Sequence, residues 1–237
     1  MSSSSGLCFI ENCRACKTRT DRAFCHLSPE ALRALDQISY AVTYPEHAVI
    51  FTADSPCHGV FLLCAGRAKL STASRDDKKV MLQVASAGEV LGLSSVLAGS
   101  HYEVGAETLS PSVLRLMKRD DFLKFLQEFP ETSFRLLEAL GLEYQLALQS
   151  LRSLAWFPTA TARVAQLLLH ICEEDGSREQ PAKVKLLLTQ EQIAQMTATS
   201  RETVTRLLSQ LRRERIITIR GSDLVIRNRA ALEQMAC

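Results

Sequence analysis

The sequence predicts an α+β protein with an N-terminal antiparallel β domain, a long helix and a C-terminal winged helix-turn-helix. Three observations lead to this fold class. Short β-rich runs separated by turn residues extend from Tyr40 to about Arg119. A long amphipathic segment follows over residues 131–153. Residues 189–215 then read as two short helices with a brief break between them, and a β-branched hairpin pattern comes directly after.

The β-rich region has the spacing of a compact antiparallel sandwich or barrel, in which strands recur about every 8–12 residues. Glycines mark the corners between the runs. A short helix is predicted over 120–129, ending before Pro130. The candidate strands are 41–44, 49–51, 59–64, 67–72, 79–85, 102–106 and 112–117.

The long helix carries apolar residues and one glycine at successive spacings of 3, 4, 3, 4 and 3. This is an a/d seam over two and a half heptads, so it predicts a homodimer that associates along the helix. The alternative is a helix that packs only on its own domain. The helix ends at 155–158, and a second amphipathic helix over 159–174 precedes a loop at 175–181. The seam residues are Phe134, Leu137, Gly141, Tyr144, Leu148 and Leu151.

The helix-turn-helix pattern begins at Thr189, a good N-cap with Gln192 at the reciprocal position of a capping box. The first helix is predicted over 190–196. Thr197-Ala198-Thr199 are poor helix formers and make the turn. Ser200 caps the second helix, in which four apolar residues cluster on one face at 100° per residue. These four are Val204, Leu207, Leu208 and Leu211.

The opposite face of the second helix has the chemistry for reading DNA. Arg201, Glu202 and Arg206 span roughly 140° by helical spacing. Arginine can donate two hydrogen bonds to guanine, and glutamate can accept one from cytosine N4. A solvated helix with ordinary surface charge is the plain alternative. The predicted DNA-contacting set, including the two caps, is Thr189, Ser200, Arg201, Glu202, Thr205 and Arg206.

A wing and a basic charge balance support the DNA interpretation. Residues 216–219 and 224–227 are β-rich and flank a turn at 220–223. Residues 183–237 hold ten Lys and Arg against five Asp and Glu, a net of 10 − 5 = +5. The whole chain is +2, so residues 1–182 sum to −3. A basic C-terminal module on a slightly acidic body indicates a polyanionic partner for that module.

Composition excludes several classes. The chain has 237 residues and is 46% hydrophobic, enough for one large or two modest cores. No apolar run approaches the roughly 18–20 residues of a membrane span, and the N-terminus lacks a secretory pattern. We therefore expect a cytoplasmic protein with no membrane partner. No Walker loop, nucleophile elbow or HExxH motif is present, so no enzyme activity is expected.

The chain resembles the CRP/FNR superfamily of bacterial transcription regulators from roughly Leu27 to its end. The most specific match is TSRETVTRLLSQLRRERII at 199–217, with Gly88–Leu93 and 220–235 as further matches. The resemblance implies a β-roll of the cyclic-nucleotide-binding type before the dimer helix and the winged helix. The implied domains are an N-terminal sensor segment 1–27, the β-roll 28–129, the dimerisation helix and hinge 130–157, and the DNA-binding domain 158–237.

The resemblance also implies partners. A homodimer would bind palindromic double-stranded DNA with TGA in each half-site, and would act with RNA polymerase. Residues at the positions of Arg201, Glu202 and Arg206 contact bases or phosphates in the family. The Arg at 201 is closer to the cyclic-AMP receptor's recognition helix, which favours TGTGA over TTGAT as the half-site.

Two features bear on which signal the protein senses: an arginine that is missing from the β-roll, and a cluster of N-terminal cysteines. Cyclic-nucleotide receptors of the family follow the Gly-Glu segment with an Arg that neutralises the phosphate, but residues 98–109 contain no Arg. A buried phosphate without a cation is costly, so a cyclic nucleotide is disfavoured and another small ligand is the alternative.

The N-terminal segment carries the spacing C-x4-C-x2-C-x8-C at Cys8, Cys13, Cys16 and Cys25. Clustered thiolates ligate iron–sulfur clusters or zinc, and oxygen sensors of the FNR type carry such cysteines ahead of the β-roll. The FNR pattern takes its fourth ligand from the strand near 112–117, which has no Cys here, so Cys8 is expected to supply it. We expect a 4Fe–4S cluster; zinc, or inert or disulfide-forming cysteines, are the alternatives. Cys57, Cys64 and Cys172 lie in apolar contexts and are expected in the core.

Overall fold

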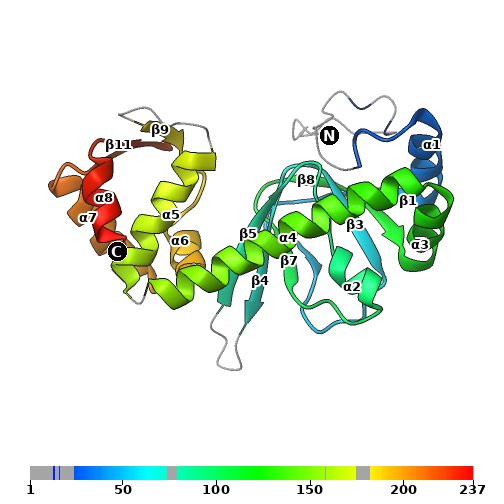
Figure 1. Ribbon diagram of the computed structural model, residues 1–237, viewed down its shortest axis with the longest axis horizontal. Coiled ribbons are helices and arrows are strands. Elements are labelled where there is room, and N and C mark those ends of the chain that lie inside the picture. The colour runs from blue at the N-terminus through cyan, green and yellow to red at the C-terminus, as the bar shows by residue number, and fades with distance from the viewer. Residues whose placement is uncertain are drawn as a thin grey trace, which may run out of the picture. The chain divides into compact units, whose positions relative to one another are not determined.

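The computed structural model describes residues 13, 16, 24–73, 79–157, 159–174 and 182–236. The chain divides into two compact units, one of residues 1–77 and 82–146 and the other of residues 78–81 and 147–237. The first holds a β-roll and the second a winged helix (Figure 1). The predicted fold class is confirmed.

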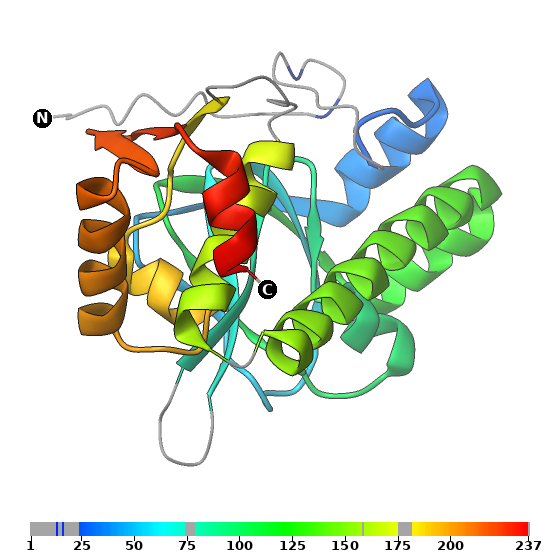
Figure 2. The same cartoon turned by 60° about the vertical axis from the view of Figure 1, so that its left-hand side comes forward.

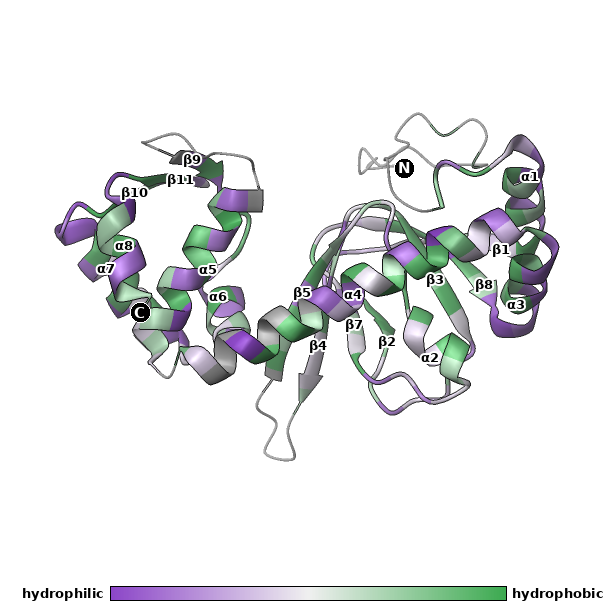
Figure 3. Cartoon of the chain, viewed as in Figure 1, coloured by the Kyte–Doolittle hydropathy of each residue, from purple (hydrophilic) through white to green (hydrophobic). Residues whose placement is uncertain are grey.

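The β-roll consists of two four-stranded sheets, ordered β1-β8-β3-β6 and β2-β7-β4-β5. β8 pairs antiparallel with both β1 and β3, and β7 pairs antiparallel with both β2 and β4. Central β3 is apolar along its length (Figure 3) because both of its faces are covered. The strands are β1 Ser39–Tyr44, β2 Val49–Phe51, β3 Gly59–Ala65, β4 Arg67–Ala73, β5 Lys79–Ser86, β6 Val90–Leu91, β7 Gly105–Thr108 and β8 Ser112–Lys118.

One predicted strand is wrong. The strand expected over 102–106 begins only at Gly105, as β7. Tyr102 lies in the preceding loop, where its ring stacks on Phe51 at a centroid distance of 4.0 Å. Its hydroxyl donates to the Gly59 carbonyl over 2.7 Å. The residue has the composition of a strand, but it is held by core packing and by this hydrogen bond rather than by a strand ladder.

Three helices accompany the β-roll: α1 Pro29–Ile38, α2 Leu93–Ala98 and α3 Arg119–Glu128. α3 confirms the helix predicted over 120–129. The other two were not predicted. α1 is capped by Ser28, whose hydroxyl accepts from the Ala31 N–H over 3.2 Å, and Pro29 opens the helix. α1 buries Leu32 and Leu35 in the same apolar core as α3.

The long helix α4 runs over Pro130–Trp156. Pro130 suits its first position, where no N–H is needed. In the first unit, Leu136 is 5% exposed, and Ala139 and Leu140 pack against the core of α1, α3 and β3. This face therefore packs on its own domain and leaves the rest of the helix surface for other contacts.

The second unit surrounds one apolar core of buried residues, including Leu168, Ile193, Leu208 and Leu224. Its sheet has the order β10-β11-β9, and α5 lies against α8 (Figure 2). The predicted wing hairpin is confirmed by β10 and β11, whereas β9 was not predicted. The elements are α5 Ala160–Glu174, β9 Ala182–Lys185, α6 Gln190–Met196, α7 Arg201–Arg213, β10 Ile217–Arg220, β11 Asp223–Ile226 and α8 Arg229–Met235.

Across the described part of the chain, no helix has both the length and the apolar character that a membrane span requires.

Candidate DNA-binding surface and sensor sites

The predicted capping of the helix-turn-helix is present. Thr189 Oγ1 accepts from the Gln192 N–H over 3.2 Å, and Gln192 Oε1 accepts from the Thr189 N–H over 2.8 Å. Ser200 Oγ accepts from the Thr203 N–H over 3.2 Å at the start of α7. Both caps satisfy N–H groups that a helix start leaves unpaired. Thr189 and Ser200 thus set where α6 and α7 begin.

The turn between α6 and α7 is held by a residue that the sequence did not single out. Arg163 of α5 donates from Nε to the Thr197 carbonyl over 2.7 Å, from Nη1 to the Phe157 carbonyl over 3.0 Å and from Nη2 to the Ala198 carbonyl over 3.4 Å. Ala198 has φ +46°, a conformation that costs energy for a residue with a Cβ. Arg163 therefore fixes the angle between the two helices. In the sequence, the only indication of this structural role is that Arg163 stands among the apolar residues of α5.

α7 separates its two faces as the sequence predicts. Val204 and Leu208 are 0% and 2% exposed, whereas Arg201, Glu202 and Arg206 are exposed. Hydrogen bonds from its own backbone N–H and from the Ser200 hydroxyl, with the Arg201 charge, hold the pKa of Glu202 below its usual value. Glu202 is therefore an ionised acceptor at neutral pH, which suits a cytosine amino group.

Thr205 is exposed, but its hydroxyl also has a partner within the protein. Thr205 Oγ1 lies 2.6 Å from Gln190 Oε1 and 2.8 Å from the Arg201 carbonyl. The contact links the start of α6 to the first turns of α7. Gln190 was not predicted as a site residue. The only feature of the sequence that pointed to it is its position at the start of α6. Thr205 can thus orient the two helices at the surface that Arg201 and Arg206 share.

The wing adds basic side chains beside this module. Arg220 is exposed at the hairpin tip, where Gly221 adopts φ +58°. Lys183 Nζ lies 3.4 Å from Asp223 Oδ2, and Lys185 also pairs with Asp223. A wing with an exposed arginine at its tip can contact a phosphate backbone.

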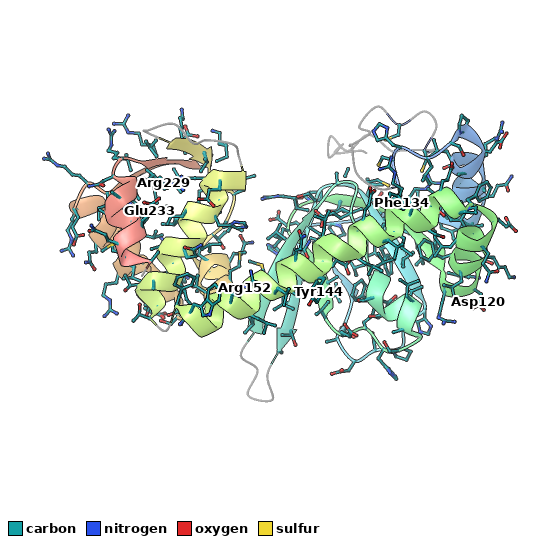
Figure 4. All side chains as sticks on the ribbon, in the orientation of Figure 1. Asp120, Phe134, Tyr144, Arg152, Arg229 and Glu233 are labelled. Carbon is teal, nitrogen blue, oxygen red and sulfur yellow. The ribbon has the colours of Figure 1, made fainter. Side chains whose placement is uncertain are left out.

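The predicted seam of α4 is exposed. Phe134, Leu137, Tyr144 and Leu151 are between 64% and 65% exposed, and Leu148 is half-buried (Figure 4 labels Phe134 and Tyr144). A Cβ built on Gly141 would meet no atom within 4 Å. Apolar side chains that stand this far into solvent along one helix stripe mark a surface that binds a partner.

The β-roll carries carboxylates near the Gly-Glu segment. Burial raises the pKa of Glu143 on α4 to about 7, and the charges of Glu89 and Glu103 add to the shift. Glu89 accepts from Gln83 Nε2 over 2.8 Å and from the Ser86 N–H over 3.1 Å. The Glu89 and Glu103 charges therefore disfavour ionisation of the Glu143 carboxyl.

The structure describes three of the four predicted metal ligands; Cys8 lies outside the described residues. Cys13 is 9% exposed, and its N–H donates to Asp36 Oδ1 over 2.8 Å. Cys16 and Cys25 are half-buried. Among the described residues, no three or more His, Cys, Asp or Glu side chains are grouped so that they could hold a metal ion. Cys172 is buried as expected, whereas Cys57 and Cys64 are half-buried.

Two family models match the chain in regions that agree with the two units. The cyclic nucleotide-binding domain matches residues 41–129, and the Crp-like helix-turn-helix domain matches residues 162–235. The CRP-like cAMP-activated global transcriptional regulator of Mycobacterium tuberculosis is 26% identical over 211 residues, covering 89% of this chain and 94% of the relative. The cAMP-activated global transcriptional regulator CRP of Pasteurella multocida is 24% identical over 184 residues, covering 77% and 88%.

Solved structures share the fold. FixK2 from Bradyrhizobium japonicum superposes with a TM-score of 0.70 at 24% identity, covering 84% of this chain and 98% of that one. A CooA variant from Carboxydothermus hydrogenoformans gives 0.73 at 22% identity, covering 90% and 92%. The capped helix α7, the wing and the two family models all indicate the same family. The chain belongs to the CRP/FNR family of DNA-binding transcription regulators.

Proposed function

We propose that the protein is a homodimer that binds a palindromic DNA site with TGA in each half-site and responds to oxygen or redox state through N-terminal cysteines. The observation that carries the DNA part is the exposed set Arg201, Glu202 and Arg206 on a helix whose start and angle are fixed by Ser200 and Arg163. In this proposal Arg201 and Glu202 read bases, and Arg206 reads a base or a phosphate. TGTGA is the favoured half-site, and RNA polymerase is the expected protein partner.

A dimer follows from the geometry of DNA. One recognition helix reads a few base pairs, and two helices related by a two-fold axis read two half-sites about one helical turn apart. The exposed seam of α4 supplies an apolar surface for this association. Association along α4 would bring two copies of α7 to one duplex.

The DNA assignment is tested by selecting bound sites from random duplexes and by titrating the selected site. Glu202→Ala should weaken binding by roughly 1–3 kcal/mol per half-site and relax preference at one position of each half-site. Glu214→Ala is the matched control, because it removes the same charge from the exposed C-terminal end of α7. If Glu202→Ala retains the wild-type base preference, the reading face lies elsewhere.

The proposed input is a 4Fe–4S cluster held by N-terminal thiolates, which supplies an oxygen-labile group when bound. Four cysteines within eighteen residues, ahead of a sensor domain without a phosphate-binding Arg, support this input. The Cys13 N–H donates to Asp36 of α1, which shares an apolar core with the β-roll, so a ligand bound by Cys13 would act directly on the sensor domain. A coloured protein after anaerobic purification, with absorbance near 400 nm that fades in air, is the expected result. A colourless protein containing zinc would leave the DNA-binding function standing and remove oxygen sensing.

A second input is favoured by the two relatives named above, both of which are described as cAMP-activated. The carboxylates Glu89, Glu103 and Glu143 and the lack of an Arg in 98–109 oppose a cyclic phosphate. Calorimetric titration with cyclic AMP separates the two inputs. Tight, saturable binding that raises DNA affinity would replace the redox input.

A further inference from the structure

We propose that Cys64 of β3, rather than Cys8, completes the metal-binding thiol set with Cys13, Cys16 and Cys25. The inference rests on the proposed cluster function and names its fourth ligand. It also moves that ligand to a different strand from the one that the family resemblance indicates, which is β8.

The N-terminal segment is fastened to the β-roll on both sides of Cys16. On one side, the Cys13 N–H donates to Asp36 Oδ1 over 2.8 Å and its side chain is 9% exposed. On the other side, Phe24 is fully buried against Phe122 at a ring-centroid distance of 5.9 Å. Cys25 follows Phe24 directly. Both ends of the segment are therefore held against one apolar core.

Cys64 packs against that same core, which contains Cys13 and Phe24. It lies where the pairing of β3 with β8 shifts register, between Leu63 opposite Leu114 and Ala65 opposite Val113. Cys64 is thus the extra residue of a β-bulge, a feature that re-aims a side chain and is common beside functional sites. Because it comes from a strand, its position is set by the sheet and does not depend on a terminal segment.

The thiols also influence one another. Burial raises the pKa of Cys64 to about 12; the Arg115 charge opposes this shift, and the charges of Cys25 and Cys16 add to it. Burial likewise raises the pKa of Cys13 to about 12, with Arg115 opposing and Cys64 among the contributing charges. Cys64 therefore lies near the three N-terminal thiols that the structure describes, and a metal has to displace the protons that burial holds on Cys13 and Cys64.

A buried cation beside these thiols has an unused donor. The Arg115 side chain is 3% exposed; its Nη2 lies 2.9 Å from Asp36 Oδ1, and its Nε donates to Ser39 Oγ over 2.9 Å. Its Nη1 is buried and has no hydrogen-bond partner within the described structure. An unsatisfied buried donor costs free energy. Four thiolates around a metal centre carry net negative charge, which would give Nη1 an acceptor and Arg115 a counter-charge.

Loading requires movement and proton release. No preformed metal-binding group exists among the described residues, so the three N-terminal thiols must converge on Cys64 when metal binds. Each thiol loses its proton to solvent as its sulfur bonds to the metal.

The test is anaerobic reconstitution of the full chain with equal amounts of ferrous and ferric iron and with sulfide, followed by iron and sulfide analysis and an absorption spectrum. Cys64→Ser should lower bound iron on the order of tenfold or more, as should Cys16→Ala. Cys8→Ser should keep the wild-type content and spectrum. Cys57→Ser is the matched control, because Cys57 is also half-buried and packs against the same core.

The outcomes separate the two proposals. If the wild-type chromophore survives in Cys64→Ser but is lost in Cys8→Ser, Cys64 is not the fourth ligand and the proposed cluster stands. If the wild-type protein takes up no iron but binds Co²⁺ with thiolate charge-transfer bands that are lost in Cys64→Ser, the four-cysteine ligand set stands and the iron–sulfur cluster is ruled out. No uptake of either metal overturns both. Circular dichroism of Cys64→Ser and Cys64→Ala, with DNA binding, establishes that the loss is not unfolding.

Discussion

The α4 seam makes a quantitative prediction about association. Leu137 is 65% exposed on the seam, and Leu142 is 61% exposed on the same helix. By helical spacing Leu142 lies roughly 130° from the middle of the seam and roughly 100° from the face that packs on the β-roll. The two leucines therefore share residue type, helix and exposure, and differ only in the direction they face. We compare Leu137→Glu with Leu142→Glu.

The expected cost follows from burial and symmetry. Fully burying a leucine side chain contributes roughly 1.5–3 kcal/mol. Because Leu137 is 65% exposed within one chain, about two-thirds of this free energy, or roughly 1–2 kcal/mol, is gained only when the dimer forms. A two-fold axis places each residue in the interface twice, so the loss is roughly 2–4 kcal/mol per dimer, before the cost of burying two carboxylates. The dimer dissociation constant should rise by roughly 30-fold to 1,000-fold or more.

Sedimentation equilibrium over a range of concentrations measures this constant. Leu137→Glu should be monomeric at concentrations where the wild type and Leu142→Glu are dimers, and its affinity for a two-half-site duplex should fall in parallel. Circular dichroism should show both variants folded, since both positions are exposed within the chain. If Leu137→Glu dimerises as tightly as Leu142→Glu, the seam is not the interface and the heptad interpretation is wrong.

Three further outcomes are expected. Asp36→Ala leaves Arg115 buried without its carboxylate and should cost about 3 kcal/mol of unfolding free energy in metal-free protein, measured by urea titration; Arg33→Ala on the same helix should cost little. Arg163→Met removes three hydrogen bonds to backbone carbonyls and should destabilise the winged helix by roughly 2–3 kcal/mol, seen as faster amide hydrogen exchange in α6 and α7. Burial raises the pKa of Glu143 from 4.5 to about 7, so its contribution to stability is present below pH 4.5 and is lost as the pH rises towards 7. Glu143→Gln should therefore flatten the fall in melting temperature over this range, and an unchanged slope would contradict the assigned pKa.

Much of the candidate DNA surface could be predicted from the sequence, because its signals are local. The capping box of Thr189 with Gln192 and the polar face of α7 depend on spacings of a few residues, which helical geometry converts directly into position. The wing strands were predicted for the same reason. β9 was not, because four residues without a local turn signal become a strand only when β11 offers a partner.

The sequence by itself determined the fold class, both ends of α6, the start of α7 and the apolar stripe of α4, because each is encoded by periodicity and capping within one segment. Tertiary structure alone decided which groups from distant segments meet. Arg163 reaches the turn after α6, and Tyr102 is drawn into the core instead of a strand. Cys64 joins the core that holds Cys13, although 51 residues separate them in the chain. Such contacts arise from the pairing of β3 with β8 and from packing around a shared core, which no local spacing in the chain records.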